Sequence, residues 1–193
     1  FITNHSSGKM GYAIARTAHR RGAKVVLVSG PVSIDCPVGV ELVKVQSARE
    51  MFDAVKKNFD DADIIIKAAA VADYRPKNIS DEKLKKKDVE LSIELERTDD
   101  ILAWLGANKK EKQFLCGFSM ETQNMLENSR AKLEKKNLDM ICANNLKTVG
   151  AGFGIDTNVV TLITKENETE LPVLSKNEVA GRILDHILDI LKK

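Results

Sequence analysis

The first residues of the chain have the types and spacing of an anion-binding loop at the start of a helix. Ser6, Ser7 and Gly8 precede an apolar helical pattern, and serine and glycine are common where a helix begins. A helix start presents unpaired backbone N–H groups and the positive end of the helix dipole, so a phosphate can bind there. A capped helix without a ligand is the alternative, because a short glycine-rich start is a weak signal.

Two further candidate groups are acidic. Asp73 follows the apolar run Ile64–Ile66 within a few residues. In open parallel sheets, ligands bind beyond the carboxyl ends of the strands, where a carboxylate can accept hydrogen bonds from ribose hydroxyls. Asp73 as the cap of a following turn is the alternative. Asp99 or Asp100 is in turn predicted to cap the next helix.

The remaining candidates are lysines. Lys83 lies in a polar loop that is rich in lysine, and most of that loop is expected to be a solvated surface. A lysine there could also act as a lid that brings positive charge to a reacting triphosphate. Lys132 and Lys136 are four residues apart and share one helix face. We expect Phe118 to end the preceding strand and to line the same cleft, although a core phenylalanine beside an exposed basic face remains possible.

Alternating strand and helix patterns must position these residues. They predict an α/β fold, a Rossmann-like three-layer domain with a mostly parallel sheet. Helices are predicted at residues 8–21, 48–59, 100–108, 122–136 and 176–191. Strands are predicted at residues 24–28, 41–45, 64–66, 89–96, 113–118 and 139–143, with a C-terminal β-hairpin of 157–164 and 169–173. The strand at 24–28 is expected to be buried on both faces, and that at 89–96 to have one solvated face.

The composition is that of one ordinary globular domain. The 193 residues are 43% hydrophobic and 30% charged, with a net charge of +2, which argues against both nucleic acid and membrane partners. No apolar run reaches membrane length. The three cysteines have no metal-binding spacing and indicate reduced thiols in a cytoplasmic protein. The sequence also contains no evident protein nucleophile.

Longer blocks of the sequence identify a protein family far more specifically than these single residues do. The chain resembles phosphopantothenoylcysteine synthetase, the ligase of coenzyme A biosynthesis, which in bacteria is usually the C-terminal half of a bifunctional flavoprotein. The matching blocks occur in the family's order and cover most of the chain. They are residues 1–11 (FITNHSSGKMG), 67–75 (KAAAVADYR), 82–86 (EKLKK), 117–118, 121–122 and 138–144 (LDMICAN).

The resemblance implies a two-step reaction. 4′-Phosphopantothenate would attack CTP to give an acyl-cytidylate, and L-cysteine would then displace CMP. Asn4 and Lys83 are the implied catalytic residues, Asn4 holding the acyl-cytidylate and Lys83 neutralising the departing pyrophosphate. The implied nucleotide-binding residues are Ser6, Gly8, Lys67, Ala68, Ala69, Asp73, Lys83, Asp99, Asp100, Ile101, Leu102, Phe118, Lys132 and Lys136. Mg²⁺ would lie between a carboxylate and the nucleotide phosphates, but no specific ligands are assigned.

The family also sets expectations about the surroundings of this domain. Residues 1–193 are expected to form a single nucleotide-binding ligase domain, and we expect it to lack the family's N-terminal strand and Gly/Thr-containing loop, which would precede Phe1. FMN is expected only in a preceding decarboxylase domain, and a homodimer is implied. Two alternatives remain: an NAD(P)-dependent oxidoreductase of Rossmann fold, of whose glycine motif only Gly8 and Gly11 match, and a non-catalytic nucleotide-binding domain.

Overall fold

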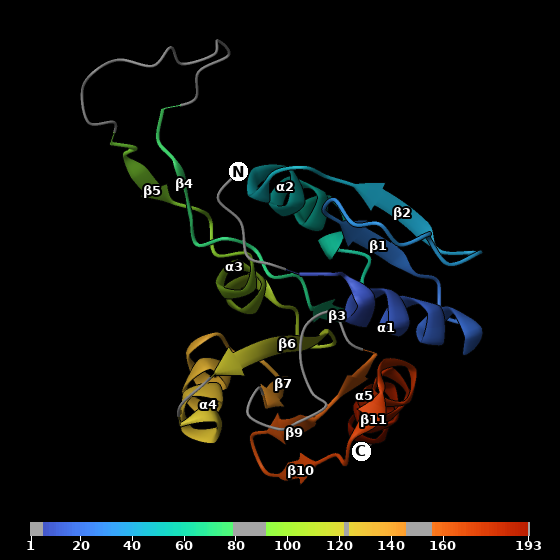
Figure 1. The fold of residues 1–193 in the computed structure, drawn as a ribbon. Coiled ribbons are helices and arrows are strands. Elements are labelled where there is room, and N and C mark those ends of the chain that lie inside the picture. The colour runs from blue at the N-terminus through green and yellow to red at the C-terminus, as the bar shows by residue number, and fades with distance from the viewer. Residues whose placement is uncertain (1–5, 79–91, 122–123, 146–155, 193) are drawn as a thin grey trace.

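A central five-stranded sheet organises the molecule, which we describe from a computed structural model of residues 6–78, 92–121, 124–145 and 156–192. The strand order is β10-β9-β7-β6-β3 (Figure 1). Strands β3, β6 and β7 are parallel, whereas β9 and β10 form an antiparallel hairpin at one edge. Their bounds are β3 Ile64–Lys67, β6 Phe114–Glu121, β7 Met140–Asn145, β9 Val160–Thr164 and β10 Glu168–Glu170. The predicted parallel sheet and C-terminal hairpin are therefore confirmed.

Helices cover both faces of this sheet and confirm the three-layer prediction. One face packs against α1 (Lys9–Arg20) and α5 (Lys176–Leu191), and the other against α3 (Ile101–Asn108) and α4 (Met125–Lys135), with α2 (Ala48–Phe59) contributing to that second core. Successive side chains of a strand point to opposite faces. Accordingly, the buried residues of β7 alternate between the two cores, with Met140 and Cys142 in one and Ile141 and Ala143 in the other.

Strands β1 (Val26–Ser29) and β2 (Glu41–Lys44) form a separate two-stranded parallel sheet. The prediction that the first of them is buried on both faces was wrong, because Val26, Leu27 and Val28 are only half-buried. Within the described residues, β1 pairs with β2 alone and β3 pairs with β6 alone, so each strand has one edge without a partner. The half-buried isoleucines of β3 follow from the same arrangement.

The strand predicted at residues 89–96 differs from the strand in the structure, which belongs to a second two-stranded ribbon. Residues 89–91 lie outside the described part of the chain, and the observed strand is β5 (Leu95–Arg97), which pairs antiparallel with β4 (Tyr74–Pro76). A salt bridge joins Arg75 Nη2 to Glu96 Oε1 at 2.7 Å across the ribbon. Strand β4 was not predicted, because its three residues are too few to show a period.

Local sequence signals explain which boundaries were predicted correctly. Helix α2 begins after Ser47, whose hydroxyl accepts from the Glu50 N–H, and α5 begins with a Ser175–Glu178 capping box. Both helices span the predicted residues. By contrast, β6 continues beyond Phe118 because its last residues pair with β7, and α4 consequently begins at Met125.

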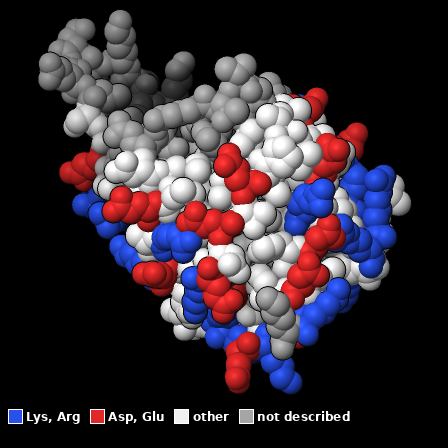
Figure 2. Space-filling model, turned by 90° about the horizontal axis from the view of Figure 1, so that it is seen from below, with Lys and Arg blue, Asp and Glu red and all other residues white. Residues whose placement is uncertain are grey.

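The predicted first strand of the hairpin is divided in two. Strand β8 (Thr157–Asn158) pairs with β11 (Leu174–Ser175), whereas β9 pairs with β7 and β10. No helix in the described residues is long and apolar enough to cross a membrane. On the face seen in Figure 2, acidic and basic side chains are interspersed, in keeping with the net charge of +2.

We expect Gly106 in α3 to be intolerant of a side chain. A Cβ there would lie 1.8 Å from the Lys136 carbonyl oxygen, so Gly106→Ala should destabilise the fold by about 3 kcal/mol through overpacking. Gly181→Ala is the matched control, because its Cβ would meet nothing closer than Arg21 Nη2 at 3.6 Å and alanine favours helix. Urea denaturation measures both. Equal stability of the two variants would contradict the predicted clash.

Candidate functional site

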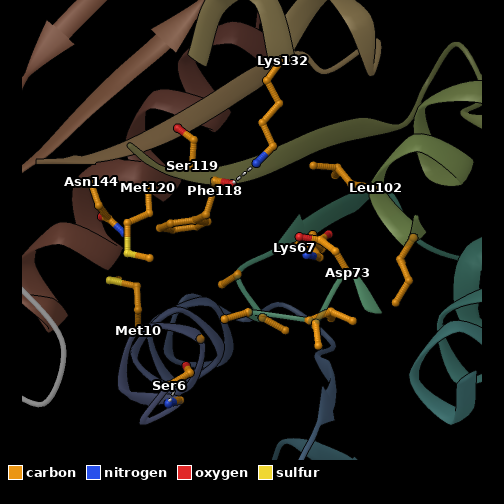
Figure 3. Close-up of a pocket in the computed structure, with 18 of the residues that line it drawn as sticks. Ser6, Met10, Lys67, Asp73, Leu102, Phe118, Ser119, Met120, Lys132 and Asn144 are labelled. Carbon is orange, nitrogen blue, oxygen red and sulfur yellow. Dashed lines mark hydrogen bonds between the residues drawn. The ribbon is translucent and has the colours of Figure 1, made fainter. Parts of the chain in front are cut away.

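A cleft of about 350 Å³ lies beyond the carboxyl ends of β3, β6 and β7 (Figure 3). This is the edge of a parallel sheet at which ligands usually bind. The start of α1, the segment after β3 and the start of α3 contribute to its walls, together with residues of α4 and α5. The predicted site residues that line it are Ser6, Gly8, Lys67, Ala68, Ala69, Asp73, Asp99, Asp100, Ile101, Leu102, Phe118, Lys132 and Lys136.

At one end of the cleft, the two lysines predicted on α4 meet the start of α3. Lys136 Nζ lies 3.1 Å from Asp100 Oδ1 and 2.8 Å from Oδ2, and Lys132 Nζ donates to the Phe118 carbonyl oxygen at 3.4 Å. Asp100 also caps α3 by accepting from the Ala103 N–H. Burial raises the pKa of Asp100, but the hydrogen bond from Lys136 and that from Ala103 outweigh it, so the carboxylate is held ionised.

Lys67 brings a third ammonium group to this end of the cleft. Burial, and then repulsion from Lys132 and Lys136, lower its pKa from 10.5 to about 8, although the carboxylates of Asp100 and Asp73 act in the opposite direction. Burial is the largest cause of this shift, and the contributions of Lys132 and Lys136 come from repulsion between neighbouring ammonium groups. An anionic ligand would reduce that repulsion.

The aspartates of the cleft differ in their partners. Asp99 lies 3.2 Å from Arg49 Nη1, and Asp100 is held by Lys136. Asp73 is exposed and, among the described residues, forms no salt bridge. Its backbone is held in place, because its carbonyl oxygen accepts from the Thr98 N–H at 2.9 Å. The Asp73 carboxylate is therefore the one of these three that remains available for a ligand.

Backbone groups form much of the remaining wall on this side. Ile101 and Leu102 are only 3% and 2% exposed, and their side chains belong to the hydrophobic core. They therefore line the cleft mainly through the first turn of α3. Ala68 and Ala69, directly after β3, present small side chains and backbone to the same space.

Phe118 lies between the two ends of the cleft. It does not end β6 as predicted, because that strand continues to Glu121, but it does line the cleft as expected. Figure 3 shows its ring next to Met10 and Met120, which together make this part of the wall apolar. The adjacent Ser119 instead has its hydroxyl 2.7 Å from that of Ser129, which ties β6 to α4.

The start of α1 lies in the wall of the cleft. Its N-cap, Gly8, has a φ of +74° and provides no side-chain cap, and its N–H lies 3.4 Å from the Ser6 hydroxyl oxygen. A Cβ on Gly8 would approach Val32 Cγ1 to 2.8 Å, so glycine is required for both space and conformation. The first backbone N–H groups of α1 therefore lie in the cleft wall without a side-chain cap.

The far end of the cleft contains residues that the sequence analysis did not select. Lys9 and Lys176 line it, and Lys9 Nζ lies 2.6 Å from Asp156 Oδ1. Asn158 donates from Nδ2 to Asn144 Oδ1 at 3.0 Å beside them. Lys9 and Lys176 were missed because each opens an amphipathic helix, where a lysine normally faces solvent. No sequence period indicates that these two helix starts converge.

The two residues implied as catalytic, Asn4 and Lys83, lie outside the described residues. Within the described part of the chain, no group of three or more His, Cys, Asp or Glu side chains is arranged to hold a metal ion. Such a group is not required for Mg²⁺, which commonly binds through one or two carboxylates together with substrate phosphates.

The fold and this cleft together define an α/β domain of the Rossmann-like class with a ligand site at the carboxyl edge of its parallel strands. Residues 1–191 match the model of the DNA/pantothenate metabolism flavoprotein C-terminal domain. The chain belongs to that family.

Individual relatives agree with this assignment. The chain is 51% identical to the coenzyme A biosynthesis bifunctional protein CoaBC of Bacillus subtilis (strain 168), covering 100% of this chain and 48% of that protein. It is 46% identical to the CoaBC protein of Vibrio vulnificus (strain YJ016), covering 99% and 48% respectively. A crystal structure of the C-terminal domain of a CoaBC protein superposes with a TM-score of 0.84 at 46% identity, covering 100% of this chain and 87% of that one. The chain thus spans about half the length of the curated relatives it matches.

The low pKa of Lys67 yields a prediction about stability. Between pH 8 and 10.5 the unfolded chain binds more protons at this residue than the folded chain does, so the stability of the wild type should rise with pH in that window. Lys67→Met should stabilise the fold by about 1–3 kcal/mol at pH 7, and this advantage should disappear by about pH 10.5.

Urea denaturation at intervals between pH 7 and 10.5 measures this difference. Lys77→Met is the control, because Lys77 lies 3.5 Å from Glu94 on an exposed ribbon away from the cleft. A Lys67→Met variant whose stability runs parallel to that of the wild type at every pH would contradict the prediction.

Proposed function

We propose that this domain is a phosphopantothenate–cysteine ligase that consumes CTP in coenzyme A biosynthesis. The observation that supports it most directly is the cleft itself, which contains the open start of α1 and has lysines at both of its ends. That arrangement suits substrates that carry phosphate at more than one position. The 51% identity to a coenzyme A biosynthesis bifunctional protein, over the whole of this chain, supports the same activity.

In the first step, a carboxylate oxygen of 4′-phosphopantothenate attacks the α-phosphorus of CTP. A P–O bond forms, the bond to the β-phosphate breaks, and pyrophosphate leaves with its electron pair. The N–H groups at the start of α1 are placed to hold phosphate oxygens, with Ser6 and Gly8 shaping that turn. Lys83 would add positive charge as pyrophosphate departs.

In the second step, the amine of L-cysteine attacks the acyl carbon of the acyl-cytidylate. The C–N bond forms, the C–O bond to CMP breaks, and the nitrogen loses a proton. Asn4 would hold this intermediate, because an amide can donate to a carbonyl oxygen and accept from an amine. Neither step needs a protein nucleophile, and positioning together with charge stabilisation carries the catalysis.

Lys132 and Lys136 are the proposed cytosine-binding residues, and Asp73 is the proposed ligand for the nucleotide's ribose or its Mg²⁺. The carboxylate of Asp73 fits that role, because Asp99 and Asp100 already pair with Arg49 and Lys136. Mg²⁺ would offset the charge on the nucleotide phosphates when it is bound.

The surroundings of the domain follow the same proposal. The parent protein would carry FMN in a preceding decarboxylase domain, form a homodimer and act in the cytoplasm. Turnover is therefore to be measured on the full-length protein, with CTP, 4′-phosphopantothenate and L-cysteine.

We expect CTP to bind more tightly than ATP in the presence of Mg²⁺. Cytosine offers a carbonyl oxygen to a lysine donor, whereas adenine has no equivalent oxygen. Lys132→Ala and Lys136→Ala should each weaken CTP by roughly 1.5–3 kcal/mol, as expected for a lost charged hydrogen bond. Titration calorimetry with CTP, ATP and NADPH measures these affinities.

Lys135→Ala is the control for these variants, because Lys135 lies on the same helix but is exposed and does not line the cleft. Comparable affinities for ATP and CTP would contradict the assignment of the nucleotide. Tighter binding of NADPH would favour the oxidoreductase alternative. Binding of CTP without any turnover would favour a non-catalytic nucleotide-binding domain.

A separate prediction divides the two half-reactions between the two implied catalytic residues. Lys83→Gln should slow pyrophosphate formation by roughly 3 kcal/mol of activation free energy, as for a preorganised electrostatic donor. Asn4→Asp should form pyrophosphate once per site and then stall with the acyl-cytidylate bound. Rapid-quench measurement of pyrophosphate and phosphopantothenoylcysteine separates the two steps.

Lys85→Gln is the control for Lys83→Gln, because both lysines belong to the same polar segment. If the burst of pyrophosphate is unchanged in Lys83→Gln, Lys83 does not take part in the first step, and its interpretation as a solvated surface lysine is favoured. Equal loss of pyrophosphate and product in Asn4→Asp would show that the proposed division is wrong.

A further inference from the structure

Thr98 joins two segments of the cleft wall that are far apart in the sequence. Residues 68–73 follow β3, residues 98–102 lead into α3, and both segments line the cleft. The Thr98 N–H donates to the Asp73 carbonyl oxygen at 2.9 Å, and the Thr98 hydroxyl donates to the Ala72 carbonyl oxygen at 2.6 Å. Two hydrogen bonds from one residue therefore hold these segments together across 26 residues of sequence.

The hydroxyl of Thr98 acts where the backbone ladder of the β4–β5 ribbon ends. Tyr74 and Arg97 are the last paired residues on the cleft side of that ribbon, and the bond from the Thr98 N–H to Asp73 continues the ladder by one step (Figure 1). Beyond that step, the side chain of Thr98 replaces a backbone donor and reaches Ala72. Without the hydroxyl, the half-buried Ala72 carbonyl oxygen would lose this donor, which is unfavourable.

The start of α3 is itself held by two neighbouring helices. Asp100 pairs with Lys136 at the end of α4 at 2.8 Å, and Asp99 lies 3.2 Å from Arg49 Nη1 on α2. Thr98 directly precedes these two aspartates, so the same contacts restrict its backbone. The segment after β3 is thus tied, through Thr98, to the end of the helix that carries Lys136.

The position of Asp73 depends on this connection. Its side chain is exposed and forms no salt bridge among the residues that the structure describes. The position of the carboxylate is therefore set by the backbone of Asp73, whose carbonyl oxygen accepts from Thr98. Loss of the Thr98 hydroxyl would loosen the Asp73 carboxylate relative to Lys136 without altering either charged group.

We propose that Thr98 is a positioning residue of the nucleotide site: its hydroxyl fixes the Asp73 carboxylate relative to the Lys136 ammonium group, so that both contact one nucleotide. This inference rests on the proposed function and deepens it at the same site. The hydroxyl has a single hydrogen, which it donates to Ala72, so Thr98 acts through Asp73 and not as a donor to the nucleotide. Groups that are fixed before binding lose less conformational entropy when the ligand arrives, so the affinity is higher.

The test is a double-mutant cycle, measured by titration calorimetry with CTP and Mg²⁺ on the full-length protein. Thr98→Val keeps the branched shape but removes the donor, and Asp73→Asn removes the charge that Thr98 positions. Each should weaken CTP by about tenfold, the loss expected for one charged hydrogen bond. In the Asp73→Asn background, Thr98→Val should weaken CTP by less than about twofold, because the two residues act as one unit.

Two further variants separate positioning from a general effect on the fold. Thr98→Ser should restore the affinity to within about threefold of the wild type, because serine keeps the donor and lacks only the methyl group that restricts its rotamer. Thr17→Val is the matched control and should leave CTP binding unchanged. Thr17 is also half-buried and its hydroxyl donates to the Ala13 carbonyl oxygen at 2.7 Å, but it does not line the cleft.

Thr98→Ala keeps the test decisive if Thr98→Val does not fold. Alanine leaves room for water to reach the Ala72 carbonyl oxygen, so the fold is less affected, while the direct link between the two segments is still lost. The same tenfold loss and the same dependence on Asp73 are expected. An alanine variant that binds CTP as tightly as the wild type would overturn the proposal.

Other outcomes distinguish this inference from the activity itself. Equal losses from Thr98→Val in both backgrounds would show that Thr98 acts independently of Asp73, and the proposal would be overturned. An Asp73→Asn variant that binds CTP normally would overturn it as well. In either case, turnover by the wild type would leave the ligase function standing. A wild type that neither binds CTP nor turns over would overturn both.

Discussion

Parallel hydrogen bonding of β3, β6 and β7 brings three strand ends to a single edge of the sheet. Each strand delivers a different group there: Lys67 from β3, Phe118 from β6 and Asn144 from β7. Because parallel strands need long connections, helices lie on both faces, and the starts of α1, α3 and α5 reach the same edge. The cleft is thus a direct consequence of the topology.

Charged side chains gather at this edge of the sheet. Lys67, Lys132 and Lys136 share one end of the cleft with Asp73, Asp99 and Asp100, while Lys9 and Lys176 line the other end, where Lys9 pairs with Asp156. The lowered pKa values of Lys67 and Lys176 show the resulting strain, since burial and neighbouring ammonium groups disfavour both charges. A site of this kind is stabilised when it binds an anion.

The apolar side chains between the two ends set the shape of the ligand that fits. Met10, Phe118 and Met120 offer no hydrogen bonds, so the charged groups of a ligand must lie towards the two ends. The start of α1, which carries Met10, contributes to the same wall. The open turn at Gly8, which a side chain would block against Val32, keeps that position accessible.

Local signals in the sequence were sufficient for α2, α5 and the glycine-rich start of α1. Helices α2 and α5 span the predicted residues and are capped by Ser47 and Ser175, and Gly8 precedes α1, because capping depends on residues within one turn of the chain. The resemblance carried by residues 1–11 and 67–75 located one side of the cleft in advance. Tertiary structure alone decided the rest. Strand β6 reaches Glu121 because its last residues pair with β7. Asp100 at the start of α3 forms a salt bridge with Lys136 at the end of α4. Lys9 and Lys176, from opposite ends of the chain, line the same cleft. Contacts of this kind produce no periodic pattern in the sequence, because they depend on how the sheet brings distant elements together.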